Sequence, residues 1–146
     1  MPTVDPEICR ADNLERIRAY FDLIATGDVD ALSQHWHDEI IFEAPFSFTG
    51  KPSRTVGKQP VYDRLSTSYG LVSMAFSITE IYELVNPDRF LVEYDSDGRM
   101  LGSGELYRNS YITLVEMQDG LISRFREFYD SQRCAAVFGP LLGPDH

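Results

Sequence analysis

The sequence is short of positive charge, of cysteine and of long apolar stretches. Its 146 residues include 13 Lys and Arg against 23 Asp and Glu, a net charge of −10. That balance excludes binding to nucleic-acid phosphates, which depends on Lys and Arg, and to an anionic membrane surface. No apolar run approaches the roughly 20 residues of a membrane span. Residues 1–7 also lack the basic and apolar regions of a signal peptide.

Cysteine and histidine are too few and too widely spaced to predict a metal site. Cys9 and Cys134 stand near opposite ends of the chain, and no CxxC or Cys/His motif surrounds them. His35 and His37 are two residues apart, with no acidic or histidine partner at ligand spacing. We therefore expect two reduced thiols in a cytoplasmic protein, and neither a metal nor a cofactor.

The composition is that of one globular domain. Hydrophobic residues make up 43% of the chain and charged residues 25%, which are ordinary values. A chain of this length corresponds to one domain and hides roughly 68–70% of its unfolded surface. We expect an N-terminal arm over residues 1–12, a single domain over residues 13–138 and a C-terminal tail over residues 139–146.

Apolar spacing predicts helices in the first half of the chain. A first helix is expected over residues 12–27, with Asp12 as its N-cap, and a short second helix carries Leu32 and Trp36. A third helix is expected over residues 60–70, with Pro60 in its first turn.

The second half is rich in β-branched and aromatic residues, which predicts strands. The expected strands are residues 40–44, 72–85, 89–95, 106–117 and 121–129, with turns at 86–88, 96–98 and 118–120 and a short helix at 131–138. Helices first and strands later, without βαβ alternation, predict an α+β fold with an antiparallel sheet. A twisted sheet closed by helices leaves a concave cavity. Eight Tyr and nine Phe could line that cavity or fill it as core.

Several stretches resemble known families. Residues 20–32 (YFDLIATGDVDAL) and 36–42 (WHDEIIF) resemble the opening of NTF2-like domains, which include ketosteroid isomerases and SnoaL-like polyketide cyclases. Residues 86–95, 106–111 and 119–128 resemble the phenazine biosynthesis A/B group. The resemblance implies an NTF2-like (cystatin-like) cone, in which three N-terminal helices pack on a strongly curved antiparallel sheet around a pocket. It also implies a homodimer.

The isomerase comparison is incomplete. Tyr20 falls where ketosteroid isomerases have the first-helix tyrosine of their oxyanion hole. The position of their carboxylate base holds Ala44, and the region of their protonated aspartate holds Ile112. Glu43, the nearest acid, is expected on the opposite face of its strand. A steroid-isomerase mechanism would therefore need a relocated base.

The phenazine A/B comparison implies a different acid. Glu127 matches a glutamate that acts as acid and base in that group, and Tyr107 and Ser68 match a pocket tyrosine and serine. Arg64 replaces the group's histidine and shares a helix face with Ser68, four residues on. An arginine there can hold a substrate carboxylate, and it can also lower the pKa of Glu127.

The residues around Glu127 in its strand also make it a candidate catalytic acid and base, independently of the resemblance. The period of two places Phe125 and Tyr129 on its face of the strand. Desolvation between aromatic rings would raise its pKa toward the range useful for general acid/base catalysis. The alternative is a surface glutamate paired with Arg124 or Arg108.

We expect Trp36, Tyr111 and Phe125 to line the pocket, with core packing as the alternative for Trp36. Asp130 is expected to cap the helix that follows it.

The expected function is cofactor-free isomerisation, condensation or cyclisation of a hydrophobic, carbonyl-bearing small molecule. Glu127 would move the proton, Tyr20 and Tyr107 would orient the substrate or stabilise an oxyanion, and Arg64 and Ser68 would hold a polar substituent. The alternatives are a non-catalytic module that binds a small molecule or a partner, an isomerase with a relocated base, and a structural dimer without a pocket. A cavity above ~300 Å³ counts against the last.

Overall fold

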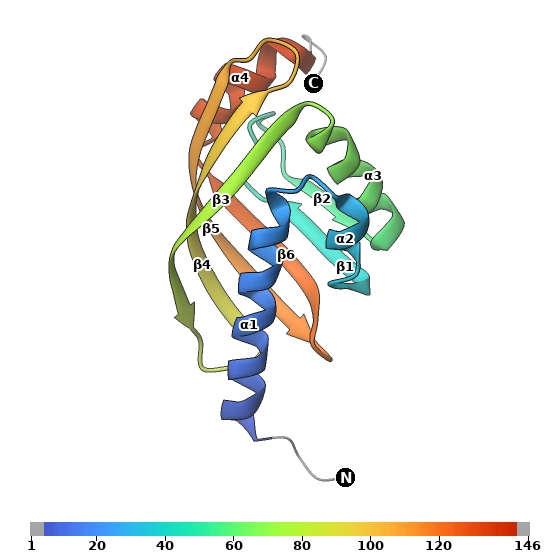
Figure 1. Cartoon of the computed structure of the whole chain (residues 1–146), viewed down its shortest axis with the longest axis vertical. Coiled ribbons are helices and arrows are strands. Elements are labelled where there is room, and N and C mark those ends of the chain that lie inside the picture. Colours follow the sequence, from blue (N-terminus) through green and yellow to red (C-terminus); the bar gives the residue numbers. More distant parts are fainter. Residues whose placement is uncertain (1–4, 143–146) are drawn as a thin grey trace.

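The computed structural model describes residues 5–142 and has the expected α+β class, with helices around one six-stranded sheet (Figure 1). The elements in chain order are α1 (Pro6–Ile24), α2 (Val29–Ser33), β1 (Trp36–Ala44), β2 (Ser53–Val56), α3 (Lys58–Tyr69), β3 (Val72–Glu83), β4 (Arg89–Met100), β5 (Leu106–Gln118), β6 (Leu121–Tyr129) and α4 (Ser131–Leu142). Among residues 5–142, no helix is both long enough and apolar enough to cross a bilayer.

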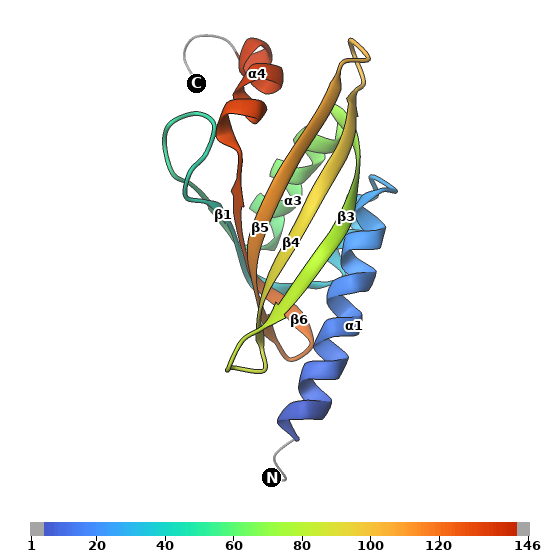
Figure 2. The same cartoon turned by 90° about the vertical axis from the view of Figure 1, so that its left-hand side faces the viewer.

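The sheet is strongly curved, and its strand order is β2-β1-β6-β5-β4-β3. Every neighbouring pair is antiparallel except β1 and β6, which run parallel, so the fully antiparallel sheet expected from the sequence is wrong at this one pair. Figure 2 shows α3 inside the curve of the sheet, α1 along β3, and α4 at the end of the molecule away from the start of α1. This arrangement leaves the concave side of the sheet partly covered by helices.

The first helix begins earlier than predicted. Asp5 is its N-cap, with its side chain accepting from the Glu7 amide, and Pro6 stands in the first turn. Asp12, the expected cap, lies inside the helix and forms an ion pair with Arg16. An aspartate followed by proline suits a helix start, because proline has no amide hydrogen to leave unsatisfied. Residues 6–12 of the expected arm are thus helical, and residues 1–4 lie outside the described range.

The second helix is shorter than predicted and leaves Trp36 in a strand. The helix ends at Ser33, and the Ile122 amide donates to the His35 carbonyl at 2.7 Å. Trp36 is then paired with Ile122 at the start of β1. Pairing with β6, which is distant in the sequence, therefore overrides the helical spacing of Leu32 and Trp36.

The turns were predicted with mixed success. Asp119 and Gly120 both have positive φ, which suits the tight two-residue turn expected between β5 and β6. Residues 96–98, also expected as a turn, lie inside β4 instead. Gly98 is needed there for space, because a Cβ would lie 3.1 Å from the Tyr107 carbonyl and 3.2 Å from a Val72 methyl. This glycine marks a close approach of strands rather than a turn.

The last helix continues past its predicted end. Gly139 and Pro140 were expected to stop it, but α4 runs to Leu142 with Pro140 inside. Val137 and Phe138 pack against a cluster that includes Val72, and this contact lies immediately before the predicted stop. Part of the expected tail is therefore helical, and residues 143–146 lie outside the described range.

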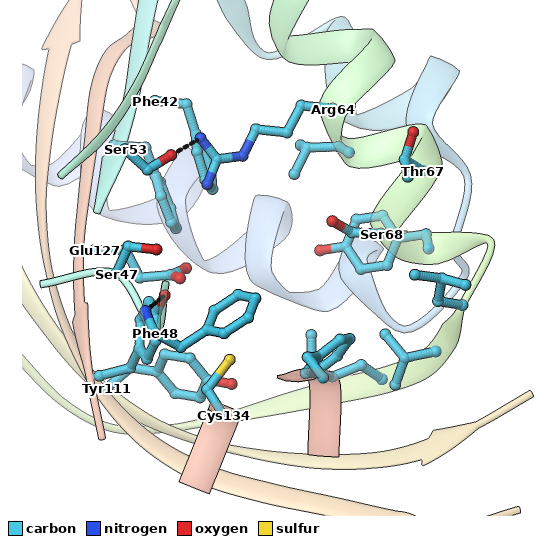
Figure 3. A pocket seen from close by; sticks show the side chains of 18 of the residues that line it. Phe42, Ser47, Phe48, Ser53, Arg64, Thr67, Ser68, Tyr111, Glu127 and Cys134 are labelled. Atoms are coloured by element: carbon cyan, nitrogen blue, oxygen red, sulfur yellow. Dashed lines mark hydrogen bonds between the residues drawn. The ribbon is translucent and has the colours of Figure 1, made fainter. Parts of the chain in front are cut away.

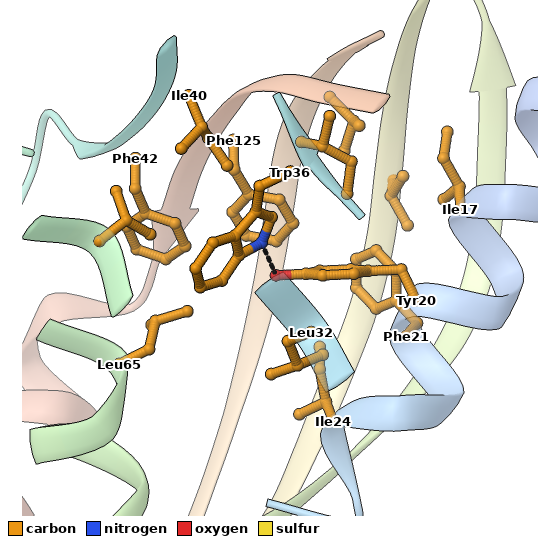
Figure 4. Packing of buried hydrophobic residues seen from close by; sticks show 14 of the residues in the cluster. Ile17, Tyr20, Phe21, Ile24, Leu32, Trp36, Ile40, Phe42, Leu65 and Phe125 are labelled. Atoms are coloured by element: carbon orange, nitrogen blue, oxygen red, sulfur yellow. Dashed lines mark hydrogen bonds between the residues drawn. The ribbon is translucent and has the colours of Figure 1, made fainter. Parts of the chain in front are cut away.

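The aromatic side chains divide between core and cavity. Phe21 of α1 packs its ring edge against Tyr94 of β4, with ring centroids 4.7 Å apart, and both side chains are buried. Phe42 and Phe125 stack at 5.1 Å, and Figure 4 shows both beside Trp36. Of these rings, Phe42 and Phe125 also line the cavity described next.

Candidate functional site

A cavity of about 600 Å³ lies between the concave side of the sheet and α3. Its wall is formed by helices α1, α3 and α4, by all strands except β4, and by the loop between β1 and β2. Most of the wall is aromatic or aliphatic, with a few polar groups, as in small-molecule sites. The volume argues against a structural dimer whose cone is filled by side chains.

Glu127 lies in the wall of this cavity. Phe125 and Tyr129 line the same cavity from the same face of β6, as the period of two predicts. The alternative ion pairs are used elsewhere: Arg124 pairs with Glu43 at 2.8 Å, and Arg108 pairs with Asp97 at 3.3 Å. Within residues 5–142, Glu127 forms no salt bridge.

Burial raises the pKa of Glu127 to about 7. Two neighbours act in the opposite direction: the positive charge of Arg64, and a hydrogen bond from Tyr94. The desolvation of the carboxylate is therefore larger than the stabilisation that these two groups provide. At neutral pH the side chain is about half protonated, so it can both give and take a proton.

Tyr94 and Thr113 lie behind Glu127, and neither was among the predicted site residues. The Tyr94 hydroxyl is 3.5 Å from Oε2 of Glu127 and 2.6 Å from Oγ1 of Thr113. Thr113 is paired with Glu127 across β5 and β6, and both Tyr94 and Thr113 are completely buried. The alternation of β4, where Phe90, Val92 and Tyr94 share the inner face, is the signal that could have found Tyr94.

Tyr20 lines the cavity, but Trp36 does not. The expectation of Trp36 as a lining residue is therefore wrong: it is buried in the core, and its Nε1 donates to the Tyr20 hydroxyl at 3.1 Å (Figure 4). Since tryptophan can only donate, the Tyr20 hydroxyl keeps its own hydrogen for another acceptor. Burial raises the pKa of Tyr20, which keeps the phenol neutral.

Tyr107 and Tyr111 lie along β5 and also line the cavity. The two hydroxyls are 3.0 Å apart, and Asn109 donates to the Tyr107 hydroxyl at 2.8 Å. Burial first, and then the neighbouring charges of Tyr107 and Glu127, raise the pKa of Tyr111. Tyr111 is thus the phenol of this pair that the Glu127 charge reaches, although sequence reasoning had selected Tyr107 for the catalytic role.

Arg64 reaches from α3 across the cavity toward β2, and Ser68 lines the same cavity one turn further along (Figure 3). The Nη1 of Arg64 donates to Ser53 Oγ at 2.5 Å and to Thr55 Oγ1 at 3.0 Å. The guanidinium carbon lies 5.2 Å from the centre of the Phe42 ring, a cation–π contact. The pKa of Arg64 is lowered by burial and raised by Glu127, but an arginine stays charged.

The loop between β1 and β2 closes one side of the cavity, and sequence reasoning missed it. Ser47, Phe48 and Lys51 line the cavity, and the Phe48 amide donates to the Tyr129 hydroxyl at 3.2 Å. The abundance of Ser, Thr, Gly and Pro predicted a loop here, but no local pattern indicates over which part of the fold a loop lies.

The position of the isomerase base carries no acid. Ala44 is buried at the end of β1, as expected, and does not line the cavity. Glu43 lies on the other face, where Arg124, Arg126 and Arg54 surround it at 2.8, 3.6 and 3.8 Å. The nearest acid to this position is therefore held away from the cavity.

The remaining predicted polar residues have structural positions. Asp130 caps α4, accepting from the amides of Gln132 and Arg133 at 3.0 and 3.2 Å. His37 lies in β1, where its Nδ1 accepts from the Glu39 amide. In the part of the chain that the structure describes, no three His, Cys, Asp or Glu side chains gather in a way that could hold a metal ion.

Comparison with known proteins gives consistent matches. A sequence profile of the SnoaL-like domain matches residues 17–125. The chain is 26% identical over 126 residues to YesE, an uncharacterised protein of Bacillus subtilis, covering 86% of each chain. It is 25% identical over 117 residues to the PhzA/B-like protein PA3332 of Pseudomonas aeruginosa, covering 80% of this chain and 83% of that one. The crystal structure of a candidate isomerase from Bacillus subtilis superposes with a TM-score of 0.81 at 24% identity, over 93% of this chain and 96% of that one.

Proposed function

This chain belongs to the SnoaL-like family, and we propose that it is an enzyme that moves a proton on a hydrophobic, carbonyl-bearing small molecule without a cofactor. The reaction class is isomerisation, condensation or cyclisation. The observation that carries this proposal is the position of Glu127: a carboxyl group without an ion-pair partner among residues 5–142, in the wall of an apolar cavity, with a pKa raised to about 7. A group with such a pKa is suited to proton transfer at neutral pH.

In the proposed reaction, the Glu127 carboxylate removes a proton from the carbon next to the substrate carbonyl. The electron pair of that C–H bond forms a carbon–carbon double bond, and the π electrons of the carbonyl group move to its oxygen, which gives an enolate. Glu127, now protonated, returns the proton to another carbon or to a leaving oxygen. Because a single residue both takes and gives the proton, the reaction needs no external acid or base.

Tyr20 is the proposed donor to the enolate oxygen. Its hydroxyl accepts from Trp36, so its own hydrogen is free for the substrate. A neutral phenol held in place in an apolar cavity stabilises developing negative charge. Tyr107, with Tyr111 beside it, is proposed to orient the substrate from β5. Arg64 and Ser68 are proposed to hold a polar substituent, and Phe125 to pack against the apolar part of the substrate.

An isomerase with a relocated base would use the same group. Among the residues that line the cavity in the described part of the chain, Glu127 is the carboxylate, so a base for any such reaction would again be Glu127. A non-catalytic binding module would use the same cavity without proton transfer. The two possibilities differ in whether bound carbonyl compounds exchange their hydrogens.

The test is hydrogen–deuterium exchange at carbons next to a carbonyl group. A panel of cyclic ketones and β-keto acids is incubated with the protein in D₂O and followed by proton NMR. We expect exchange with at least one member, slowed about 100-fold or more in Glu127→Gln. Glu93→Gln, the same change at a glutamate hydrogen-bonded to Tyr82 outside the cavity, is the control and should keep the rate. Binding of panel members without exchange would support a binding module instead.

The proposal includes a cytoplasmic homodimer, formed through the outer face of the sheet. Ile112 is 46% exposed on β5 and is paired with Phe128 of β6. Phe46, which is 69% exposed, lies beside Phe128 with ring centroids 5.7 Å apart. Apolar side chains gathered on one sheet face favour an interface with a second copy. The free state of Cys9 and Cys134 is consistent with a reducing compartment.

A further inference from the structure

The guanidinium of Arg64 is held in place by the protein itself. Nη1 donates to Ser53 and Thr55 of β2, and Phe42 lies against the guanidinium plane. These contacts fix the end of a long side chain that would otherwise be free to rotate, so its ordering does not depend on a ligand.

One edge of this guanidinium is unused. Within residues 5–142, neither Nε nor Nη2 of Arg64 has a hydrogen-bond acceptor, although the side chain lines the cavity. Nε and Nη2 together form the edge with which arginine binds the two oxygens of a carboxylate. The free edge therefore has the geometry of a carboxylate site.

Arg64 also has no acidic partner in direct contact, in contrast to most other arginines of the described residues. Arg16, Arg124 and Arg133 each form an ion pair with an aspartate or glutamate, whereas Arg64 forms none among the residues that the structure describes. A partly buried cation without a counter-ion is unfavourable. An anion entering the cavity would supply the missing charge.

Glu127 is the charged group that faces Arg64 in the cavity. The other titratable groups that the Glu127 charge reaches are Tyr20 of α1, Tyr69 of α3, Tyr94 of β4, Tyr111 of β5, Tyr129 of β6 and Cys134 of α4. The pKa of each is raised, in every case mainly by burial, so all of them are neutral at pH 7. Lys51, whose side chain is exposed, is a further cation of the wall.

We propose that the cavity binds the carboxylate of an organic acid on the free edge of Arg64, and that Glu127 takes up a proton from solvent as this carboxylate binds. The inference rests on the proposed function and narrows it: the substrate is a hydrophobic carbonyl compound that also carries a carboxylate. Proton removal from carbon is then carried out by the fraction of the complex in which Glu127 is ionised. Protonated Glu127 keeps an O–H that can donate to the bound ligand, whereas two ionised carboxylates beside one guanidinium would repel each other.

The sign of the pH dependence follows from this exchange of charge. A bound carboxylate neutralises Arg64, which is the charge that holds the pKa of Glu127 down, and adds a negative charge nearby. The pKa of Glu127 therefore rises above about 7 in the complex. Binding then weakens as the pH rises above 7 and is independent of pH between about 5.5 and 6.5, where Glu127 is mostly protonated before binding.

The experiment compares a carboxylate with its neutral isostere. Naphthalene-2-carboxylate and naphthalene-2-carboxamide, and the smaller pair benzoate and benzamide, are titrated by calorimetry and by the fluorescence of Trp36, the single tryptophan. We expect the carboxylates to bind more tightly than the amides. Arg64→Met should weaken carboxylate binding about 10- to 100-fold while changing amide binding less than about threefold. Arg18→Met, the same change at an exposed arginine of α1 outside the cavity, is the matched control and should change neither.

Proton uptake provides a second readout on the unaltered protein. Calorimetry in buffers of different ionisation enthalpy should show uptake of more than about half a proton at pH 8 and almost none at pH 5.5. Glu127→Gln should abolish the uptake. Equal affinity for acids and amides, no effect of Arg64→Met, or no uptake at pH 8 overturns the inference. None of these results depends on turnover, so slow exchange in the ketone assay would count against the proposed function alone.

Discussion

The Tyr94 hydroxyl lies 3.5 Å from Oε2 of Glu127, inside the core and behind the wall of the cavity. The same hydroxyl is much nearer to Thr113, at 2.6 Å, so its link to the carboxylate is the weaker of two. This hydrogen bond lowers the pKa of Glu127, and burial, which raises it, has the larger effect. Tyr94, supported by Thr113, thus lowers the pKa of Glu127 from the buried side of the carboxyl group, away from the cavity.

Tyr94→Phe tests this arrangement. Removing the hydroxyl removes a donor to the ionised carboxylate, so we expect the pKa of Glu127 to rise above about 7, by less than about one unit. The Thr113 hydroxyl loses its partner in the core, which should lower the free energy of unfolding by about 1–3 kcal/mol. A titration of Glu127 and a urea denaturation measure the two effects. Thr113→Val is the control: it leaves Tyr94 free to donate to Glu127 and should not raise the pKa.

Glu127→Gln is expected to stabilise the protein at high pH. The pKa of Glu127 is about 7 in the folded state, above the ordinary value of 4.5, so folding favours the protonated form. The unfolded chain releases this proton first as the pH rises, and stability falls between about pH 4.5 and pH 7. The glutamine variant lacks this loss, so we expect a gain of about 1–3 kcal/mol at pH 8 and no gain at pH 4. Thermal denaturation of both proteins from pH 4 to pH 8 measures this gain. A stability difference that does not change with pH would contradict a raised pKa of Glu127.

Arg64→Met should raise the pKa of Glu127, because the guanidinium charge lowers it. A shift of about one unit is expected for the loss of one opposite charge across a cavity. The midpoint of the Glu127 titration measures it. Arg64→Lys keeps a positive charge at this position, so the pKa of Glu127 should stay close to that of the unaltered protein. Arg18→Met, at an exposed position outside the cavity, should leave the midpoint unchanged.

Tyr20→Phe should separate a structural effect from a catalytic one. The Trp36 Nε1 loses its acceptor in the core, so the fluorescence of Trp36 should change and stability should fall by about 1–3 kcal/mol. If Tyr20 donates to the enolate, ketone exchange should also slow about 100-fold or more. Tyr82→Phe changes a phenol that is hydrogen-bonded to Glu93 and is 48% exposed. It should leave both readouts unaltered.

Ile112→Asp tests the proposed dimer. A charge in the middle of the outer sheet face would be buried without a partner in the interface, so we expect a monomer by light scattering. Val85→Asp, at a fully exposed position in the turn after β3, should keep the mass of the unaltered protein. A dimer that tolerates the Ile112 change would show that the two copies meet elsewhere.

The parts of the site that the sequence could predict are those set by local periodicity. The alternation Phe125, Glu127, Tyr129 correctly predicted an inward-facing acid between two aromatic residues. The spacing of Arg64 and Ser68 correctly predicted a shared face of α3 on the cavity. In both cases, residues close in the sequence determine which way a side chain points.

The parts that failed depend on contacts between distant segments. Trp36 lies in β1 because this segment pairs with β6. Neither helical nor strand spacing predicts its hydrogen bond to Tyr20. Ser53 and Thr55 hold Arg64 only because β2 folds back along β1. No local pattern carries that information, so tertiary pairing decides these positions.

Proton transfer by Glu127 requires that its carboxyl group titrate near neutral pH. The most direct measurement is a carbon-13 NMR titration of the glutamate side-chain carboxyls, with the resonance of Glu127 assigned by its absence in Glu127→Gln. We expect a midpoint near pH 7 for this resonance. A midpoint near 4.5, the ordinary value for a glutamate side chain, would contradict this assignment.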